Sequence, residues 1–289
     1  MEENESHSLP PHYKIDDESD KSYRRNFDTS VFDGDEPPTT HEELQGTQHF
    51  DWGSINSVRN SDKLEIGLRV KVKVLKENGG GSQLDVSTLL TPDDLAPIFS
   101  GAEWAGTRLW YAAIVTINFI YTNYVKTGFI DNLSHSSLIE LGCGLGVPGL
   151  VAKAFGVDKV VLTDQESLLS LTKKNVAVNF PDGEVVARQL DWSREGIKEI
   201  IRGEGKFDLA VVTDCVYEPL YGKSWELLVE VCDELLKENP DLVCLHSMER
   251  RNGDGIDSFL RALAALDSVV KVEKVYSEDV IEIYLVYGR

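Results

Sequence analysis

The spacing of apolar and polar residues changes along the chain, and these changes mark the boundaries of its regions. Between Leu68 and Val74 every second residue is aliphatic and the residues between are Arg or Lys, which predicts a half-exposed strand. A glycine-rich run at 78–81 breaks this strand, and aliphatic positions resume at 84–89, as in a hairpin. The apolar run at 109–125 is shorter than the ~20 residues of a membrane span, so we predict a helix that faces the core.

Beyond residue 136, short aliphatic runs alternate with longer amphipathic segments. The predicted strands are 137–141, 159–163, 184–190, 207–213, 242–246, 269–276 and 280–287, and the predicted helices are 147–155, 165–179, 195–202, 223–238 and 256–266. Strands that alternate with helices form a parallel sheet covered on both faces. A hairpin at 277–279 turns the last strand antiparallel. We therefore predict an α/β fold with a Rossmann-like, seven-stranded, mostly parallel and doubly wound sheet, extended by the N-terminal β-hairpin.

The first 60 residues differ from the rest in composition. They are rich in Glu, Asp, Ser, Pro and Asn and have almost no aliphatic clusters. Such a segment buries too little apolar surface to offset its ordering entropy, so we predict a disordered acidic tail over 1–60. Residues 61–135 then hold the hairpin and the first helix, and 136–289 form the core domain.

Charge and cysteine content narrow the classes of partner. The chain has 29 Lys and Arg against 49 Asp and Glu, a net charge of −20, and such a surface repels nucleic-acid phosphates. The four cysteines form no C-x-x-C pair and no framework spacing, which argues against structural zinc and a disulfide scaffold and favours a reducing compartment. We expect no metal site. The first residues lack the basic and apolar regions of a secretory signal. We expect a monomer in the cytoplasm, with the nucleus as an alternative, and no membrane partner.

A glycine-rich turn joins the first core strand to the next helix. Residues 139–149 read Ile-Glu-Leu-Gly-Cys-Gly-Leu-Gly-Val-Pro-Gly and contain the G-x-G-x-x-G fingerprint, which lets a cofactor approach the backbone. An acid two residues before the first glycine disfavours the pyrophosphate of NAD, so NAD-dependent oxidoreduction is a distant alternative. S-adenosylmethionine, with no phosphate and a positive sulfonium, suits the turn better. We assign Glu140, Gly142, Cys143 and Gly144 to its binding.

Acids also follow the next two strands. Asp164 ends the second core strand, where a carboxylate can accept both ribose hydroxyls of a cofactor; its alternative role is a helix cap. Asp191 and Trp192 follow the third strand, where they could bind and wall an adenine. The alternative there is a core tryptophan beside a solvated acid.

The motifs together resemble a known family. The glycine loop, Val-Leu-Thr-Asp at 161–164, Leu-Asp-Trp at 190–192 and Asp-Cys-Val-Tyr at 214–217 are similar to the seven-β-strand protein lysine methyltransferases of the methyltransferase-16 group. The resemblance covers about residues 64–289 and implies S-adenosylmethionine as cofactor and a protein substrate. Through the family's G-x-x-x-W motif it implies that Trp110 lines the cofactor pocket. Ser247–Arg250 resembles the family's Glu-Arg element, followed here by an Arg-Asn-Gly-Asp-Gly insertion.

The D-x-x-Y motif supplies the expected catalytic pair. Methylation of a lysine needs a neutral amine aimed at the sulfonium methyl, although the free side chain has a pKa near ~10.4. Asp214, at a strand end beside the cofactor, would orient the amine and contact the cofactor, and the ring of Tyr217 would wall the lysine channel. Alternatively, Asp214 is a cap and Tyr217 is a packed surface aromatic residue. Two other functions stay open: a methyltransferase for a protein histidine or a small molecule, and a non-catalytic cofactor-binding scaffold.

Overall fold

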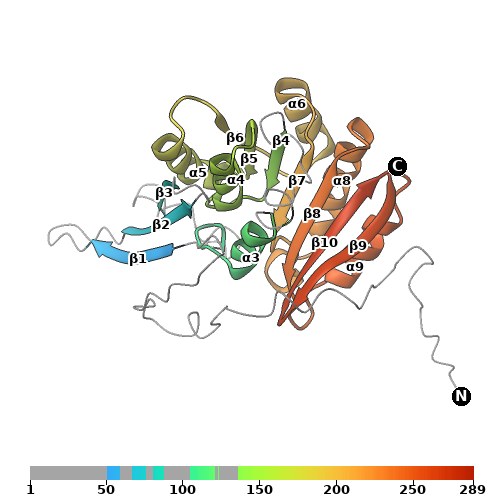
Figure 1. The fold of residues 1–289 in the computed structure, drawn as a ribbon. Helices are drawn as coiled ribbons and strands as arrows, with labels where there is room; N and C mark the ends of the chain where they lie inside the picture. The colour runs from blue at the N-terminus through green and yellow to red at the C-terminus, as the bar shows by residue number, and fades with distance from the viewer. Residues whose placement is uncertain (1–50, 59–66, 76–80, 88–104, 121–122, 124–135) are drawn as a thin grey trace, which may run out of the picture.

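A computed structural model describes residues 51–58, 67–75, 81–87, 105–120, 123 and 136–289 (Figure 1). Its N-terminal part is a three-stranded antiparallel sheet in the order β1-β2-β3, formed by β1 (Asp51–Val58), β2 (Gly67–Leu75) and β3 (Gly81–Ser87). β2 and β3 are the predicted hairpin. This sheet contacts two helices of the core domain, α4 (Val147–Phe155) and α5 (Glu166–Asn179), and Leu84 and Val86 are buried there.

The main sheet has seven strands in the order β6-β5-β4-β7-β8-β10-β9. They are β4 (Ser137–Leu141), β5 (Lys159–Asp164), β6 (Val185–Gln189), β7 (Leu209–Thr213), β8 (Val243–Glu249), β9 (Val269–Glu278) and β10 (Ile281–Gly288). Strands β4 to β8 are parallel, whereas β10 is antiparallel to both neighbours, β8 and β9. The predicted fold class is therefore confirmed, including the reversed last strand.

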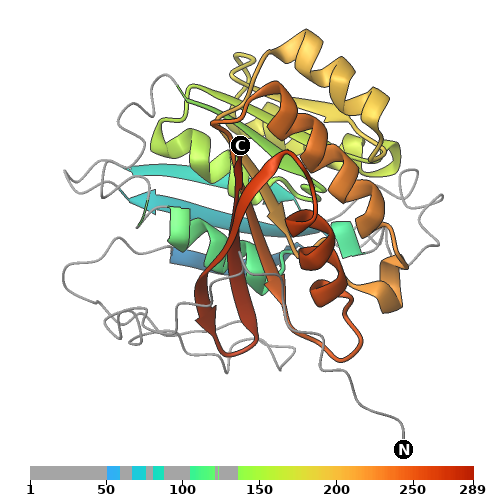
Figure 2. The ribbon, with the colours of Figure 1, turned by 90° about the vertical axis from the view of Figure 1, so that its right-hand side faces the viewer.

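Helices cover both faces of this sheet. On one face lie α3 (Tyr111–Ile120), α4 (Val147–Phe155) and α5 (Glu166–Asn179), and on the other α6 (Arg194–Glu204), α8 (Trp225–Glu238) and α9 (Ile256–Ala264). Figure 2 shows the sheet running between the green helices of the first face and the orange helices of the second. The alternation along each strand divides the core in two. In β4, for example, Leu138 faces the first layer of helices and Ile139 the second.

Three local features differ from the sequence prediction. Strand β1 lies within the segment 1–60, for which we predicted a disordered tail. It forms because pairing with β2 satisfies its backbone hydrogen-bonding groups, and such pairing cannot be predicted from composition. Residues 1–50 lie outside the described residues, so the prediction for them stays untested. A short helix, α7 (Glu218–Tyr221), precedes α8. The last hairpin turns at 279–280 and not at 277–279, with Asp279 in the left-handed region at φ 50°.

The apolar run at 109–125 is a core helix over its described part. Seven residues of α3 are buried, and Thr116 is satisfied by donating its hydroxyl to the Ala112 carbonyl, 2.8 Å away. In the part of the chain that the structure describes, no helix combines the length and apolarity that a membrane crossing needs.

Candidate active site

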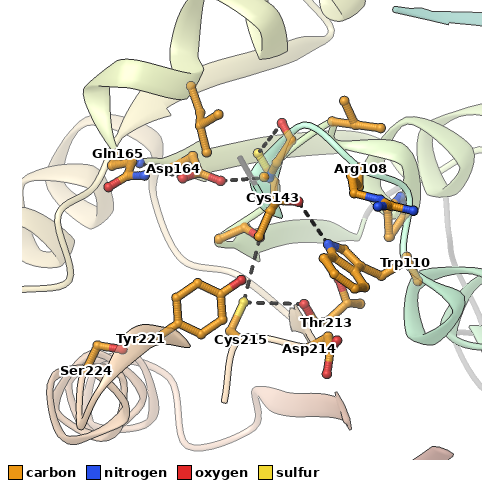
Figure 3. A pocket seen from close by; sticks show the side chains of 18 of the residues that line it. Arg108, Trp110, Cys143, Asp164, Gln165, Thr213, Asp214, Cys215, Tyr221 and Ser224 are labelled. Carbon is orange, nitrogen blue, oxygen red and sulfur yellow. Dashed lines mark hydrogen bonds between the residues drawn. The ribbon is translucent and has the colours of Figure 1, made fainter. Parts of the chain in front are cut away.

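A cavity of about 450 Å³ lies at the carboxyl ends of β4, β5, β6 and β7 (Figure 3). Its volume is within the range of ligand pockets, and this end of a parallel sheet is where open α/β folds bind ligands. Most residues assigned from the sequence line it, namely Trp110, Gly142, Cys143, Gly144, Asp164, Asp191, Trp192 and Asp214. Glu140 and Tyr217 do not.

The glycine loop is held closely by other parts of the chain. Gly142 and Gly144 have φ of 63° and 51°, a region that side chains rarely adopt. A Cβ on Gly144 would lie 2.6 Å from the Gly106 carbonyl oxygen, and one on Gly142 would lie 2.7 Å from the Cys215 sulfur. The segment before α3 and the end of β7 therefore pack directly on the loop and leave no space for a side chain at these two positions. This packing requires glycine there whether or not a cofactor is bound.

Asp164 fastens this loop to β5. Its Oδ2 accepts a hydrogen bond from the Gly144 N–H at 2.7 Å, and its Oδ1 accepts one from the Gln165 N–H at 2.8 Å. Burial raises the pKa of the carboxyl to about 6, although both bonds lower it. Asp164 thus occupies the α5 N-terminus and the cavity wall together, and each oxygen keeps a second lone pair for a ligand hydroxyl.

Glu140 lies beneath the loop and not at the cavity wall. The alternation of β4 turns its side chain toward α4, where Oε2 accepts a hydrogen bond from the Gly149 N–H at 2.8 Å. The side chain is fully buried, and Oε1 has no hydrogen-bond partner. Burial raises the pKa of this carboxyl to about 8, so it is mostly protonated at neutral pH. Burial therefore disfavours the negative charge expected of Glu140, and its side chain is turned away from the cavity that a pyrophosphate would enter.

At the end of β7, Asp214 is held by an arginine. Arg251 donates from Nη1 to Oδ1 of Asp214 at 3.1 Å and from Nη2 to Oδ2 at 2.6 Å, and the Glu249 N–H donates to Oδ1 at 3.2 Å. The carboxylate is almost fully buried and its backbone is left-handed, with φ 53°. Although burial opposes its charge, hydrogen bonding to Asp214 raises the pKa of Arg251, so the guanidinium stays charged.

The same guanidinium packs between two aromatic rings. Its carbon lies 4.9 Å from the ring centroid of Tyr217 and 5.7 Å from that of Trp110, and Nη2 also bonds Glu249 Oε2 at 2.7 Å. We call the four residues Trp110, Tyr217, Asp214 and Glu249 the cation seat. It adjoins the cavity, because Trp110 and Asp214 line both. Tyr217 therefore belongs to this seat and not to the cavity itself.

Sequence reasoning missed Arg251 and Tyr221. Arg251 lies in the insertion after the Glu-Arg element, where nothing in the sequence connects it to Asp214. Tyr221 lines the cavity from α7, four residues beyond the Tyr of the D-x-x-Y motif. An aromatic residue one helical turn after that motif was the available signal.

Cys232, Cys244 and His246 form a buried group away from the cavity. Their potential ligand atoms lie within 4.8 Å of one another, a proximity that sequence spacing could not reveal because α8 and β8 contribute them. The Cys232 sulfur lies 3.9 Å from His246 Nε2, and the imidazole packs edge-on against Phe259. The group is fully enclosed in apolar core and separate from the site described above.

Comparison with known proteins identifies the family. The profile of the lysine methyltransferase family matches residues 98–282, which include the glycine loop, Asp214 and Arg251. This chain belongs to the lysine methyltransferase family. Membership gives the family's methyl donor, S-adenosylmethionine, as the cofactor for the cavity.

Individual relatives match this chain over part of their own length. The secreted RxLR effector protein 48 of Plasmopara viticola is 44% identical over 126 residues, covering 40% of this chain and 64% of that protein. The histidine protein methyltransferase 1 homolog of Dictyostelium discoideum is 29% identical, covering 46% and 40%. The protein N-lysine methyltransferase METTL21A of Danio rerio is 34% identical, covering 38% and 47%. The matched segments thus span between 40% and 64% of these three relatives.

Proposed function

We propose that this chain transfers a methyl group from S-adenosylmethionine to a lysine side chain of a protein substrate. The observation that carries the proposal is the cation seat beside the cavity. Two aromatic rings and two carboxylates hold a guanidinium there, next to the carboxyl ends of the parallel strands. Aromatic walls and carboxylates are the chemistry that recognises a long basic side chain.

The strand order supports one orientation of the cofactor. The acids Asp164 and Asp191 follow the neighbouring strands β5 and β6, so they would take the ribose and the adenine. The rest of the cofactor would then cross the glycine loop after β4 toward β7. A cavity of about 450 Å³, lined by Trp192 and by the glycine loop, fits such an extended ligand. Bound there, S-adenosylmethionine supplies an electrophilic methyl group.

The acceptor would reach the cofactor through the cation seat. Asp214 Oδ2 accepts one bond, from Arg251, so it retains a lone pair for an incoming amine. An aligned, desolvated amine gains most of its reactivity from this positioning, because the displacement at the methyl carbon needs no covalent enzyme intermediate. The guanidinium of Arg251 beside the amine disfavours its charged form, which favours the neutral nucleophile. Tyr217 would contribute its ring as a wall.

A labelled-methyl experiment tests the proposal. The purified chain would be incubated with S-adenosylmethionine carrying an isotopically labelled methyl group and a cell lysate, and the modified residue located by mass spectrometry. We expect label on a lysine, and roughly 100-fold less label with Asp214→Asn. Label on histidine would replace lysine as the acceptor, as the Dictyostelium relative's name suggests. Cofactor binding without any transfer, in this assay and in automethylation, would favour the scaffold alternative.

We also propose a cytoplasmic or nuclear location, a monomer, and no nucleic-acid or membrane partner. All four cysteines are free and buried, which supports a reducing compartment. The net charge of −20 supports a basic protein substrate over a phosphate-bearing one. Size-exclusion chromatography with light scattering checks the monomer, and a mass of two or more chains would contradict it.

A further inference from the structure

Two cysteines and a histidine meet in the core between α8 and β8, on the second face of the sheet (Figure 2). Cys244 and His246 are two positions apart on β8, so their side chains point to the same face, and Cys232 reaches that face from α8. All three residues are fully buried, and their potential ligand atoms lie within 4.8 Å of one another. Among the described residues, no other three His, Cys, Asp or Glu side chains gather their ligand atoms as closely.

The imidazole of His246 lacks the strong hydrogen bonds that a buried polar ring normally makes. Its Nδ1 has no hydrogen-bond partner. Its Nε2 lies 3.9 Å from the Cys232 sulfur, which is long even for a hydrogen bond to sulfur. Phe259 packs edge-on against the ring, with 5.1 Å between the centroids. A buried polar group left in this state costs free energy, and an ion is one of the partners that can satisfy it.

The spacing of the sulfur and nitrogen atoms fits a metal ion. In a tetrahedral zinc site, bonds of about 2.3 Å to sulfur and about 2.0 Å to nitrogen place these two atoms about 3.5 Å apart. The Cys232 sulfur and His246 Nε2 are 3.9 Å apart, so they would need to approach by only about 0.4 Å. Thiolate and imidazole are ligands that zinc and monovalent copper prefer over the harder metal ions.

We propose that Cys232, Cys244 and His246 bind one thiophilic metal ion, Zn²⁺ or Cu⁺, inside the core. Zn²⁺ would displace the thiol protons of both cysteines to solvent, and Cu⁺ would displace one. In either case the thiolate charge balances the charge of the ion, so no net charge is buried. Without an ion, a hydrogen bond with Cys244 and burial raise the pKa of Cys232, and that thiol stays protonated.

Such an ion would fasten α8 to β8 from within. The site differs from the expectation of no metal, which considered only the spacing of cysteines along the sequence. It lies apart from the cavity, and none of its three ligands lines that cavity. Metal binding is therefore independent of the proposed methyl transfer, and either can fail without the other.

Metal analysis of the full chain tests the site. Because the group is fully enclosed, the chain would be unfolded with a chelator and a reductant, refolded anaerobically with Zn²⁺ or with Cu⁺, desalted, and analysed by inductively coupled plasma mass spectrometry. We expect about one ion per chain, and at least about tenfold less metal in Cys232→Ala and in Cys244→Ala. Cys215→Ala is the matched control, because it removes a buried thiol outside the group and should retain the ion.

Thermal melts of the unaltered chain give a second measurement that does not depend on how the variants fold. The chain refolded with the bound ion should melt several degrees above the chain refolded with chelator alone. Uptake of one ion and not the other identifies the metal. The inference is wrong if the unaltered chain takes up neither ion, or if both cysteine variants retain it. A bound ion that leaves the melting temperature unchanged would lie outside the core and would also overturn the inference.

Discussion

The left-handed backbone of Asp214 determines which substitution tests its role. Among residues other than glycine, Asn and Asp adopt φ near +53° most readily, whereas Ala there adds backbone strain to any loss of function. Asp214→Asn keeps the shape and the backbone preference and removes the charge. We expect methyl transfer at saturating cofactor to fall by roughly 100-fold, because the amine loses the charged acceptor that orients it, while the fold persists.

Asp241→Asn is the matched control for that variant. Asp241 is exposed and lies just before β8, at the opposite end of the sheet from the cavity. It should transfer methyl groups at the unaltered rate. Near-normal turnover of Asp214→Asn on the native substrate would remove Asp214 from the proposed mechanism and leave it the role of a structural partner for Arg251.

Glu140 predicts a pH dependence of stability. Its pKa is about 8 in the folded chain because of burial, against an ordinary 4.5. Between these values the folded state holds more protons than the unfolded state, so the free energy of unfolding falls as pH rises from about 4.5 to 8. Glu140→Gln keeps an acceptor for Gly149 and removes this dependence. Its melting temperature should exceed that of the unaltered chain by several degrees at pH 8.5 and show no such advantage at pH 5.

Thermal melts across this pH range measure the difference between the two proteins. Asp164 also has a raised pKa, and its charge raises that of Glu140, so the difference between the two curves reports Glu140 together with its coupling to Asp164. A constant difference in melting temperature at all pH values would show that Glu140 does not titrate in this range.

The sequence predicted which residues line the cavity better than it predicted what those residues contact. Motif and strand position located Asp164, Asp191 and Asp214, since the carboxyl ends of parallel strands meet at one edge. It could not predict that Glu140 is buried beneath the loop or that Arg251 pairs with Asp214. Those contacts depend on which way a side chain turns and on how a loop after β8 folds back, and neither is periodic.

At the scale of elements, other segments pack so closely on the glycine loop that adding a side chain there should reduce stability. Gly144→Ala must place a Cβ 2.6 Å from the Gly106 carbonyl oxygen as well as hold a side chain at φ 51°. Gly156→Ala meets only the second problem, because nothing lies within 4 Å of its Cβ at φ 114°. We expect Gly144→Ala to lower the melting temperature more than Gly156→Ala does, and to weaken S-adenosylhomocysteine at least about tenfold.

Calorimetry and thermal melts of the two variants provide the test. Gly156 ends α4 on the side away from the loop, so its variant should bind the ligand as the unaltered chain does. Equal melting temperatures for the two variants would mean that the segment carrying Gly106 moves away without cost.

The ends of a helix or strand could be predicted where the sequence has a residue that favours such an end. Gly146 and Gly156 flank α4, and the predicted and observed bounds of that helix agree. Strand β1 was not predicted because its sequence has no aliphatic alternation, and it forms by pairing with β2. α7 was missed because four residues are too few for a helical period to appear.

At the scale of the whole molecule, the N-terminal sheet predicts different stabilities for two truncated proteins. Composition alone would predict the same stability for both. Deleting residues 1–50 leaves β1 in place, and we expect the melting temperature and cofactor affinity to stay unchanged, because that segment has little apolar content to contribute. Deleting residues 1–60 also removes β1 and exposes the edge of β2, so it should lower the melting temperature or promote aggregation. Equal melting curves for the two truncations would show that β1 adds nothing to stability.

The position of β10 between β8 and β9 has a consequence for the order of folding. β9 precedes β10 in the sequence but touches the sheet only through it, so β9 cannot join the parallel strands on its own. The hairpin of β9 and β10 is local and can form within ~1–10 μs, whereas docking of β10 on β8 must also close the loop around α9. We expect the two strands to dock as a preformed pair. In pulsed hydrogen exchange, amides bonded between β9 and β10 should become protected no later than those between β8 and β10, and the reverse order would mean that β10 docks first and recruits β9 afterwards.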